Sequence, residues 1–326
     1  MGVGILGLGY YLPERVVKNS DLEAVSKATD EWIVSRVGIR ERRVCSEDEA
    51  ASDLAYKASL EALADAGVEP AAIDLIIVAC SNHDMIMPST ACIVQAKLGA
   101  TNAAALDIRA GCAGFIYGLS VAEKFVKDGT TKLSLVIGAE VHSKMMDWRD
   151  YRTNAFFSDG AGAAVVGVVP DGFGILGTFL AAEGHLGDAL VVPAGGSRMP
   201  ASHETVAAGL HYIRHDGKAI WAFATRVFPH SVRRAAERAS IQISDIDFVI
   251  PHQANINMIR QCMAGLGLPM EKTHITLDRF GNSASGTVPI TLAEAVRLGK
   301  IKRGDTIAMT AFGAGLTYGA IILKWY

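Results

Sequence analysis

Cys112 stands among small residues in DIRAGCAGF (107–115), between an apolar, strand-like stretch and the helical run YGLSVAEKFVKDG. At the N-terminus of a helix, a thiol meets unpaired backbone N–H groups and the positive end of the helix dipole, which both favour the nucleophilic thiolate. Gly111 and Gly114 permit a tight turn and the close approach of a ligand. A buried cysteine can also be a small hydrophobic residue without chemistry. The setting favours a nucleophile that reacts with iodoacetamide faster than the other four cysteines.

Two further side chains could work with such a thiol. His252 follows a strand-like run in VIPHQANINMI, and Asn255, three residues later, faces the same way if a helix begins there. Asn282, in DRFGNSASGTVPITLAEAV, lies among small residues that lead into Pro289 and the first turn of a helix. The ordinary interpretations are a hydrogen-bonded core histidine and an asparagine in a turn or cap. The glycine loop in AFGAGLTYGAIIL could supply backbone N–H groups to an oxyanion.

Three other patterns carry weaker signals. The glycines of GILGLGYYLP have the wrong spacing for a dinucleotide-binding loop. His211 and His215, in HYIRH, have the i,i+4 spacing of a metal pair, but no further ligand supports them, and we expect no metal site. Arg226, Arg233 and Arg234 form a basic stripe, which is either a solvated face or a docking site for an acidic partner.

Composition limits the class of protein. The chain has 326 residues, half of them hydrophobic, and a formal net charge of −3, which argues against binding to nucleic acid or to a membrane surface. No apolar stretch reaches the roughly 20 residues that span a bilayer, and the N-terminal sequence lacks the features of a signal peptide. Five scattered cysteines without a CxxC pair suit a reducing compartment. We therefore expect a cytoplasmic protein.

Helices and strands alternate along the chain, as in an α/β protein. The segment 71–82, AAIDLIIVACSN, resembles the segment 244–255, SDIDFVIPHQAN, and each follows an amphipathic helix, at 52–66 and at 220–239. This internal repeat predicts a duplicated α/β fold. Because ligands of such sheets gather beyond the carboxyl ends of the strands, the repeat also predicts that His252 lies in the site region.

Seven ordered motifs resemble those of the β-ketoacyl-acyl-carrier-protein synthase III family over nearly the whole chain. They are GLGYYLPERVVKNSDL, TDEWIVSRVGIRERR, DIRAGCAGF, FSDGAGAAVV, PHQAN, DRFGNSASGTVP and AFGAGLTYGA. The resemblance implies the thiolase fold, two pseudo-symmetric βαβαβαββ halves stacked in five layers (αβαβα), and a homodimer. The halves would be residues 1–170, with Cys112, and residues 171–326, with His252 and Asn282. These three residues match the catalytic cysteine, histidine and asparagine of the family.

The resemblance also implies an acyltransferase that begins fatty acid synthesis. In the family, an acyl group moves from coenzyme A to the cysteine, and the Cys112 N–H would pair with one from the loop 312–315 to hold the oxyanion. Malonyl-acyl carrier protein then loses CO₂, and the enolate attacks the thioester while His252 and Asn282 stabilise the developing charge. Acyl-CoA and the acyl carrier protein are thus the expected partners, and no metal or other cofactor is expected.

Coenzyme A recognition carries over in part. Trp32 and Arg36, in TDEWIVSR, match the family residues that hold the adenine end, and we expect Arg152 and Asn255 to complete the binding site. The family's arginine before its GDGAGA segment aligns with Tyr151, so that Arg152 stands one place late.

Two more positions depart from the family. Ser158 stands where glycine is usual, and Asn257 replaces a basic residue that docks the carrier. These departures leave open a specialised condensing enzyme or acyltransferase of secondary metabolism that uses an unusual acyl-CoA. A non-catalytic subunit that binds a companion synthase is the other alternative. Such subunits tend to lose the nucleophile, which this chain retains.

Overall fold

The computed structural model describes all 326 residues and contains two principal β-sheets. The first sheet has the order β1-β7-β6-β4-β5, in which β4 runs parallel to β5 and β6, and β7 runs antiparallel to β1 and β6. Nearly every residue of β4, β6 and β7 is buried, as expected for apolar strands that are covered on both faces. The strands are β1 (Gly2–Tyr11), β4 (Leu75–Ala79), β5 (Ala104–Ile108), β6 (Ser134–Val141) and β7 (Asp159–Val169).

The second sheet has the order β11-β12-β13-β8. In this sheet β12 runs parallel to β11 and antiparallel to β13, and β8 runs antiparallel to β13. Its strands are β8 (Gly174–Ala182), β11 (Phe248–Pro251), β12 (Thr306–Gly313) and β13 (Thr317–Lys324). The first sheet is therefore built from the N-terminal half of the chain and the second from the C-terminal half.

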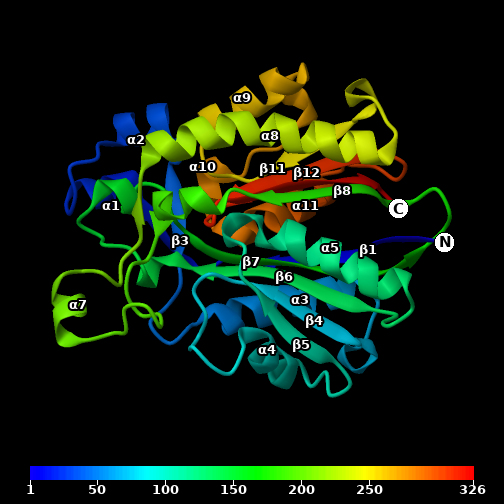
Figure 1. Cartoon of the computed structure of the whole chain (residues 1–326), viewed down its shortest axis with the longest axis horizontal. Coiled ribbons are helices and arrows are strands. Elements are labelled where there is room, and N and C mark those ends of the chain that lie inside the picture. The colour runs from blue at the N-terminus through cyan, green and yellow to red at the C-terminus, as the bar shows by residue number, and fades with distance from the viewer.

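Helices fill the space between the two sheets and cover both outer faces, so that the molecule has five layers (Figure 1). A core of 26 buried residues lies between the sheets, around α5 (Gly114–Lys127) and α11 (Thr287–Arg297). The outer helices are α3 (Ala51–Ala66) and α4 (Thr90–Leu98) on the first sheet, and α8 (Gly217–Ala239) and α9 (Ile256–Leu266) on the second. No helix of the chain is both long and apolar enough to cross a membrane.

The remaining elements are short. Two separate antiparallel ribbons are formed by β2 (Arg15–Lys18) with β3 (Glu41–Val44), and by β9 (Leu190–Val191) with β10 (Arg214–His215). The short helices are α1 (Asn19–Glu23), α2 (Asp30–Arg36), α6 (Tyr151–Asn154), α7 (His203–Ala207) and α10 (Leu277–Phe280). The 3-10 turns are η1 (Pro70–Ala72), η2 (Gly111–Ala113), η3 (His142–Lys144), η4 (Gly184–Ala189), η5 (Ile243–Asp245), η6 (Met270–Lys272) and η7 (Ala284–Gly286).

The internal repeat of the sequence has a structural counterpart in two aspartates. Asp74 and Asp247 precede β4 and β11, and each binds the neighbouring central strand through both its backbone and its side chain. The Asp74 N–H donates to Leu133 O at 2.9 Å, and Asp74 Oδ2 accepts from the Lys132 N–H at 2.7 Å. The Asp247 N–H donates to Thr306 O at 2.9 Å, and Asp247 Oδ2 accepts from the Thr306 N–H at 2.8 Å. The two strands thus occupy equivalent places in the two sheets.

One strand of the expected repeat is reduced. The first half follows the βαβαβαββ order from β1 to β7, with β2, β3, α1 and α2 inserted. In the second half, a single bridge between Thr273 and Val249 takes the place of the strand between α9 and α11. The Thr273 hydroxyl donates to Val249 O at 2.8 Å, and Lys272 Nζ donates to Ile246 O at 2.6 Å. Side chains thus satisfy carbonyl groups that a fifth strand would otherwise bind.

The free edges of the other outer strands are covered unequally. On β1, the N–H groups of Leu8 and Tyr10 donate to carboxylates of α3. On β8, carbonyl groups accept hydrogen bonds from the side chains of Tyr117 and Arg238. No side chain hydrogen-bonds the backbone of β5, and none of its residues is fully buried. The edge of β5 is therefore open.

Candidate active site

Cys112 lies in the turn η2, between the end of β5 and the first residue of α5. Gly111 has a φ of +53°, a conformation that favours glycine. A Cβ on Gly111 would collide with the backbone nitrogen of Ala314, and a Cβ on Gly313 would collide with the backbone nitrogen of Cys112. The glycine loop between β12 and β13 therefore packs directly against the backbone of the predicted nucleophile.

His252 directly follows β11, and its backbone N–H donates to Thr310 O of β12 at 2.8 Å. Its imidazole is buried, and Nδ1 lies 2.6 Å from the hydroxyl oxygen of Thr287 at the start of α11. That hydroxyl also lies 2.9 Å from Ala284 O. Burial, with a smaller contribution from His142, lowers the pKa of His252 to about 3. The imidazole is therefore neutral at physiological pH.

Asn282 is held by its backbone and by one atom of its side chain. The Asn282 N–H donates to Phe156 O at 3.2 Å, and Asn282 O accepts from the Ser158 N–H at 3.0 Å. Oδ1 accepts from the Ala284 N–H at 2.8 Å, which leaves both Nδ2 protons available. Ala284 has a φ of +43°, in the left-handed region. The N–H of Ala284 thus orients Asn282, and the carbonyl oxygen of Ala284 accepts from the Thr287 hydroxyl that contacts His252.

These three side chains meet in one pocket. The pocket has a volume of about 160 Å³ and is lined by Cys112, His252 and Asn282, with Phe312 and Gly313 from the glycine loop. The ring of Phe312 packs edge-on against the imidazole of His252, with 5.5 Å between the centroids. A second cavity, of about 80 Å³, also has Cys112 in its wall. The cysteine therefore borders two spaces, and one of them contains the other two candidate catalytic groups.

The protonation state of Cys112 differs from the sequence-based expectation. Its side chain is 7% exposed, and burial together with the negative charge of Glu140 raises the pKa of the Cys112 thiol well above its usual range. Glu140 is completely buried at the end of β6 and accepts hydrogen bonds from the N–H groups of Ser81 and Asn82 and from the Ser285 hydroxyl. The free protein thus holds a thiol at Cys112, not the thiolate that the sequence led us to expect. Sequence reasoning missed Glu140, although it is the only charged residue in the apolar strand β6.

The residues expected at coenzyme A lie outside this pocket, apart from Asn255. Trp32, on α2, packs edge-on against Tyr151 with 5.6 Å between the ring centroids. Arg36 ends α2, and its carbonyl oxygen accepts from Asn255 Nδ2 at 2.9 Å. Asn255 Oδ1 caps α9 by accepting from the Asn257 N–H at 2.8 Å. Asn255 thus fixes α2 to the start of α9, and it also lines the pocket of Cys112, so the predicted contact with coenzyme A stays a prediction.

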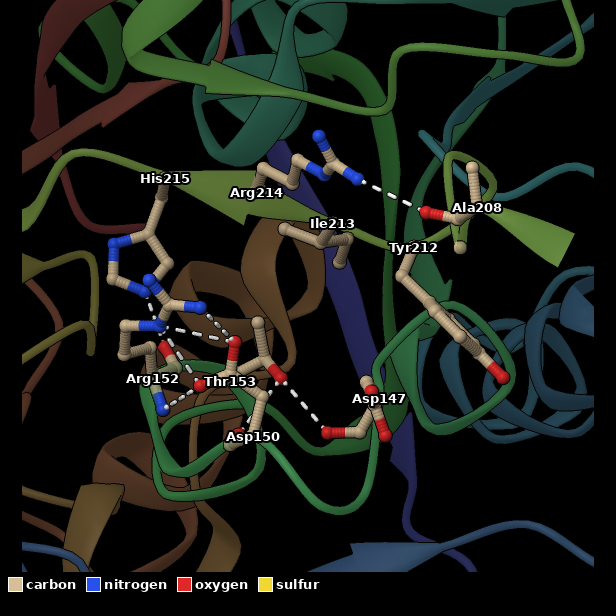
Figure 2. Close-up of a pocket in the computed structure, with 10 residues that line it drawn as sticks. Asp147, Asp150, Arg152, Thr153, Ala208, Tyr212, Ile213, Arg214 and His215 are labelled. Atoms are coloured by element: carbon tan, nitrogen blue, oxygen red, sulfur yellow. Dashed lines mark hydrogen bonds and ion pairs between the residues drawn. The ribbon is translucent and has the colours of Figure 1, made fainter. Parts of the chain in front are cut away.

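Arg152 lines a different, open pocket of about 370 Å³ (Figure 2). Its guanidinium group forms hydrogen bonds with both carboxylate oxygens of Asp150, the shortest at 2.6 Å. Nε2 of His215 hydrogen-bonds the carbonyl oxygen of Arg152, and His215 also lines the pocket of Cys112. The two pockets are therefore adjacent. His211 and His215 lie on a turn and on β10, not on one helix, and no cluster of three or more potential metal ligands occurs in the chain.

The departures from the family pattern have local roles in this chain. The Ser158 hydroxyl accepts from the Arg43 N–H at 2.9 Å and donates to Arg43 O at 3.0 Å, which fixes β3 to the start of β7. Asn257 Nδ2 donates to Arg36 O at 3.2 Å and lies 3.3 Å from Ser35 O. Arg260, one turn further along α9, is exposed and donates to Asn257 Oδ1 at 3.0 Å. A basic side chain is thus present near the position where one was missing.

The three arginines of the predicted basic stripe contact different neighbours of α8. Arg226 forms an ion pair at 2.8 Å with Glu183, which directly follows β8. The Arg234 guanidinium lies over the ring of Phe179 in β8. Arg233 instead hydrogen-bonds Gly265 O in α9. Arg233 therefore contacts α9, the helix that carries Arg260.

Comparisons with known proteins agree with this site. The chain matches the family described as 3-Oxoacyl-[acyl-carrier-protein (ACP)] synthase III over residues 106–184 and its C-terminal counterpart over residues 236–325. A β-ketoacyl-[acyl-carrier-protein] synthase III of Caldanaerobacter subterraneus subsp. tengcongensis is 51% identical over 100% of this chain and 98% of that protein. The chain belongs to the β-ketoacyl-[acyl-carrier-protein] synthase III family.

Further relatives of the synthase extend this result. A β-ketoacyl-[acyl-carrier-protein] synthase III of Syntrophomonas wolfei is 49% identical over 100% of this chain and 98% of that protein. The crystal structure of 3-oxoacyl-[acyl-carrier-protein] synthase III from Aquifex aeolicus VF5 superposes with a TM-score of 0.92 and 42% identity, over 99% of this chain and 100% of that chain. The family resemblance, the thiolase fold and the assignment as an acyltransferase are thereby confirmed.

Proposed function

We propose that the synthase joins an acyl group from acyl-CoA to malonyl-acyl carrier protein, giving 3-oxoacyl-acyl carrier protein, CO₂ and coenzyme A. The observation that carries the proposal is the single pocket lined by Cys112, His252 and Asn282. The N-terminal half, residues 1–170, would supply the nucleophile, and the C-terminal half, residues 171–326, would supply the other two groups. No metal or further cofactor takes part in the proposed reaction.

In the first step, the Cys112 thiol gives its proton to Nε2 of His252, and the sulfur attacks the thioester carbon of acyl-CoA. The C–S bond to coenzyme A breaks, and the leaving thiolate takes the proton from His252. Burial keeps the imidazole of His252 neutral in the free protein, so one of its ring nitrogens has a free lone pair, although the lowered pKa makes the imidazole a weak base until substrate changes its surroundings. The Thr287 hydroxyl donates its proton to Ala284 O and can at the same time accept a hydrogen bond from Nδ1–H; it can donate to bare Nδ1 only by giving up the bond to Ala284.

In the second step, the C–C bond to the malonyl carboxylate breaks, and CO₂ leaves. The charge that develops on the malonyl thioester oxygen is stabilised by Asn282 Nδ2 and by an N–H at Nε2 of His252. The enolate carbon then attacks the acyl thioester, and its C–S bond breaks to release the Cys112 thiolate. One proton from solvent restores the thiol and balances the reaction.

Substrate binding is proposed around the mouth of this pocket. The adenine end of coenzyme A would contact Trp32, Tyr151 and the guanidinium of Arg36, and Arg152 would lie beside the neighbouring open pocket. The acidic carrier protein would dock on α8 and α9, where Arg233 and Arg260 are exposed and Arg233 contacts α9.

A cytoplasmic homodimer is the proposed form of the enzyme. Three apolar side chains in the loop between β4 and α4 are exposed, Met85, Ile86 and Met87, and the last two are more than three-quarters exposed. Such a patch is typical of a protein interface. The open edge of β5 offers backbone groups to a second copy of the strand. Size-exclusion chromatography with light scattering measures this state directly.

Two measurements test the proposed reaction separately. Intact mass after mixing with acetyl-CoA should increase by one acetyl group, and Cys112→Ser should abolish the adduct. Adding malonyl-acyl carrier protein should then remove the adduct and release CO₂. An enzyme that forms no adduct with any acyl-CoA would be a binding subunit instead. The specialised alternative differs only in the acyl group that it accepts, so a screen of acyl-CoA chain lengths separates it from the main proposal.

A further inference from the structure

The smaller cavity beside Cys112 contains two polar side chains in an otherwise apolar wall. Ser81 and His142 line it, and the apolar wall includes Met145, Phe157, Leu190, Val191, Val192 and Ile213. An acyl group on Cys112 must leave the larger pocket free, because the malonyl group needs His252 and Asn282 there. Under the proposed function, the acyl chain therefore enters the smaller cavity.

His142 is buried in this wall without a hydrogen bond at either ring nitrogen. Its side chain is 5% exposed, and its ring stacks on Phe157 with 4.9 Å between the centroids. Nδ1 has no partner, and Nε2 lies 3.9 Å from Glu140 Oε2, beyond hydrogen-bond distance. The Glu140 carboxylate already accepts hydrogen bonds from other groups and does not depend on His142. An imidazole in this position carries a desolvation cost that nothing in the free protein offsets.

Ser81 is the second group with unused hydrogen-bonding capacity. Its backbone N–H donates to Glu140, at 3.0 Å from Oε2, but its hydroxyl group makes no hydrogen bond within the protein. The hydroxyl can donate and accept, and a neutral imidazole has one nitrogen of each kind. The pair can therefore bind one oxygen atom of a ligand inside the cavity.

The size of the cavity limits the length of the chain that carries this oxygen. An apolar cavity of roughly 150 Å³ holds a benzene ring. The volume of about 80 Å³ is about half as large, which corresponds to roughly three or four non-hydrogen atoms beyond the thioester carbon.

We propose that the preferred starter of this synthase is a short acyl-CoA that carries a hydroxyl or keto oxygen on its chain, bound by His142 and Ser81. His142 is then the residue that determines specificity, because it places hydrogen-bonding nitrogens where an aliphatic chain would need only apolar contacts. This inference rests on the proposed function, since it assumes that Cys112 is acylated from acyl-CoA.

The test compares starters of equal chain length in the acylation of the intact enzyme. We expect 3-hydroxybutyryl-CoA, acetoacetyl-CoA or both to acylate Cys112 with a kcat/KM at least about tenfold above that of butyryl-CoA, because a buried polar site discriminates against an analogue that leaves it unpaired. His142→Leu should abolish this preference and raise the rate with butyryl-CoA. Met145→Leu changes an apolar residue of the same wall and should keep the preference.

The outcomes separate this inference from the proposed function. If the wild-type enzyme uses butyryl-CoA as well as both oxygenated starters, the inference is wrong, whatever the variants do. A preference that survives in His142→Leu would also overturn the role of His142. No adduct with any acyl-CoA, acetyl-CoA included, would instead contradict the proposed function. If His142→Leu does not fold, Ser81→Ala provides the second variant, and it should reduce the preference.

Discussion

The Nδ1 atom of His252 lies 2.6 Å from the hydroxyl oxygen of Thr287, a residue 35 positions further along the chain. The same hydroxyl lies 2.9 Å from the carbonyl oxygen of Ala284, whose N–H holds Oδ1 of Asn282. The turn η7 therefore orients both groups that the proposed mechanism places against the malonyl thioester. A change in this turn should affect chemistry more than substrate affinity.

Replacing Thr287 tests this connection. Thr287→Val keeps the shape of the side chain but removes the hydroxyl, so the imidazole loses its hydrogen-bond partner at Nδ1. We expect kcat for condensation to fall about tenfold, equivalent to one hydrogen bond of about 1.4 kcal/mol, with KM for malonyl-acyl carrier protein nearly unchanged. Thr287→Ser should retain most of the activity. The matched control is Thr291→Val, which removes another buried hydroxyl of α11, bonded to Thr276. Equal losses in Thr291→Val and Thr287→Val would indicate a purely structural effect.

Asn282→Ala should separate the two half-reactions. The amide group faces the pocket with both Nδ2 protons free, and the charge that it would stabilise develops only on the malonyl thioester. We expect nearly normal acylation from acetyl-CoA and a loss of CO₂ release on the order of 10²–10³, the usual cost of one oxyanion donor. Single-turnover acylation and CO₂ release are measured separately. Equal loss of both activities in a folded variant would contradict this role.

The cysteines should differ in their reaction with a small alkylating reagent and with substrate. Cys92 is exposed, whereas Cys45 and Cys262 are buried, and burial raises the pKa of each of these two thiols to about 12. Burial and Glu140 also raise the pKa of Cys112. We therefore expect iodoacetamide to label Cys92 first, contrary to the expectation from the sequence alone, and acetyl-CoA to modify only Cys112. Peptide mapping distinguishes the sites. Alkylation of Cys112 before Cys92 would contradict this prediction and would indicate a thiolate at Cys112, as expected from the sequence.

Stability should decrease below neutral pH because of His252. Burial lowers its pKa from 6.5 to about 3, so the unfolded chain binds a proton that the folded chain does not bind in this range. The stabilisation is complete above about pH 6.5 and is lost as the pH falls toward 3, at about 1.4 kcal/mol per pH unit. The free energy of unfolding is measured with urea at pH 7.5 and pH 5.0, at one protein concentration, for the wild type and for His252→Gln. Between these pH values it should fall by about 2 kcal/mol less in the variant than in the wild type. His185→Gln, at an exposed histidine, is the control. A pH dependence that is the same in all three proteins would contradict the burial argument.

Charge reversal on α8 and α9 should weaken carrier docking. Arg233→Glu and Arg260→Glu each place a negative charge on one of the two helices on which the acidic carrier would dock. We expect a several-fold increase in KM for malonyl-acyl carrier protein at low salt, which should diminish above about 0.5 M salt as the charges are screened. Acylation from acetyl-CoA should not change. Lys132→Glu, before β6, is the control. An unchanged KM in both variants would leave this surface as an ordinary solvated face.

The motifs of the sequence predicted three residues, Cys112, His252 and Asn282, that the structure brings together in one pocket, and their catalytic roles stay predictions. Cys112 could be recognised from the turn between a strand and a helix, and the aspartates of the internal repeat keep equivalent hydrogen bonds in both sheets. The reduced strand at Thr273 was not predicted, because a strand and a single bridge can have similar local sequences.

Other features of the site depend on tertiary contacts that no local pattern records. The hydroxyl of Thr287 and the carboxylate of Glu140 act on His252 and Cys112 only after distant segments pack together. The raised pKa of Cys112 has the same origin, because the expected effect of the helix N-terminus ignores burial and neighbouring charge. The sequence likewise did not show that the side chain of Asn255 joins α2 to α9, whereas its predicted ligand contact stays a prediction.

The unequal sheet edges limit how this protein can polymerise. Three of the four outer strands, β1, β8 and β11, have backbone groups that are already bound by side chains, and β5 alone has none. In the two principal sheets, the edge of β5 is therefore the place where a foreign strand would add most readily. When two copies meet there, each uses its single available edge, and no template remains for a third. In the proposed homodimer, the first sheet would thus continue across two molecules and leave no open edge in the principal sheets.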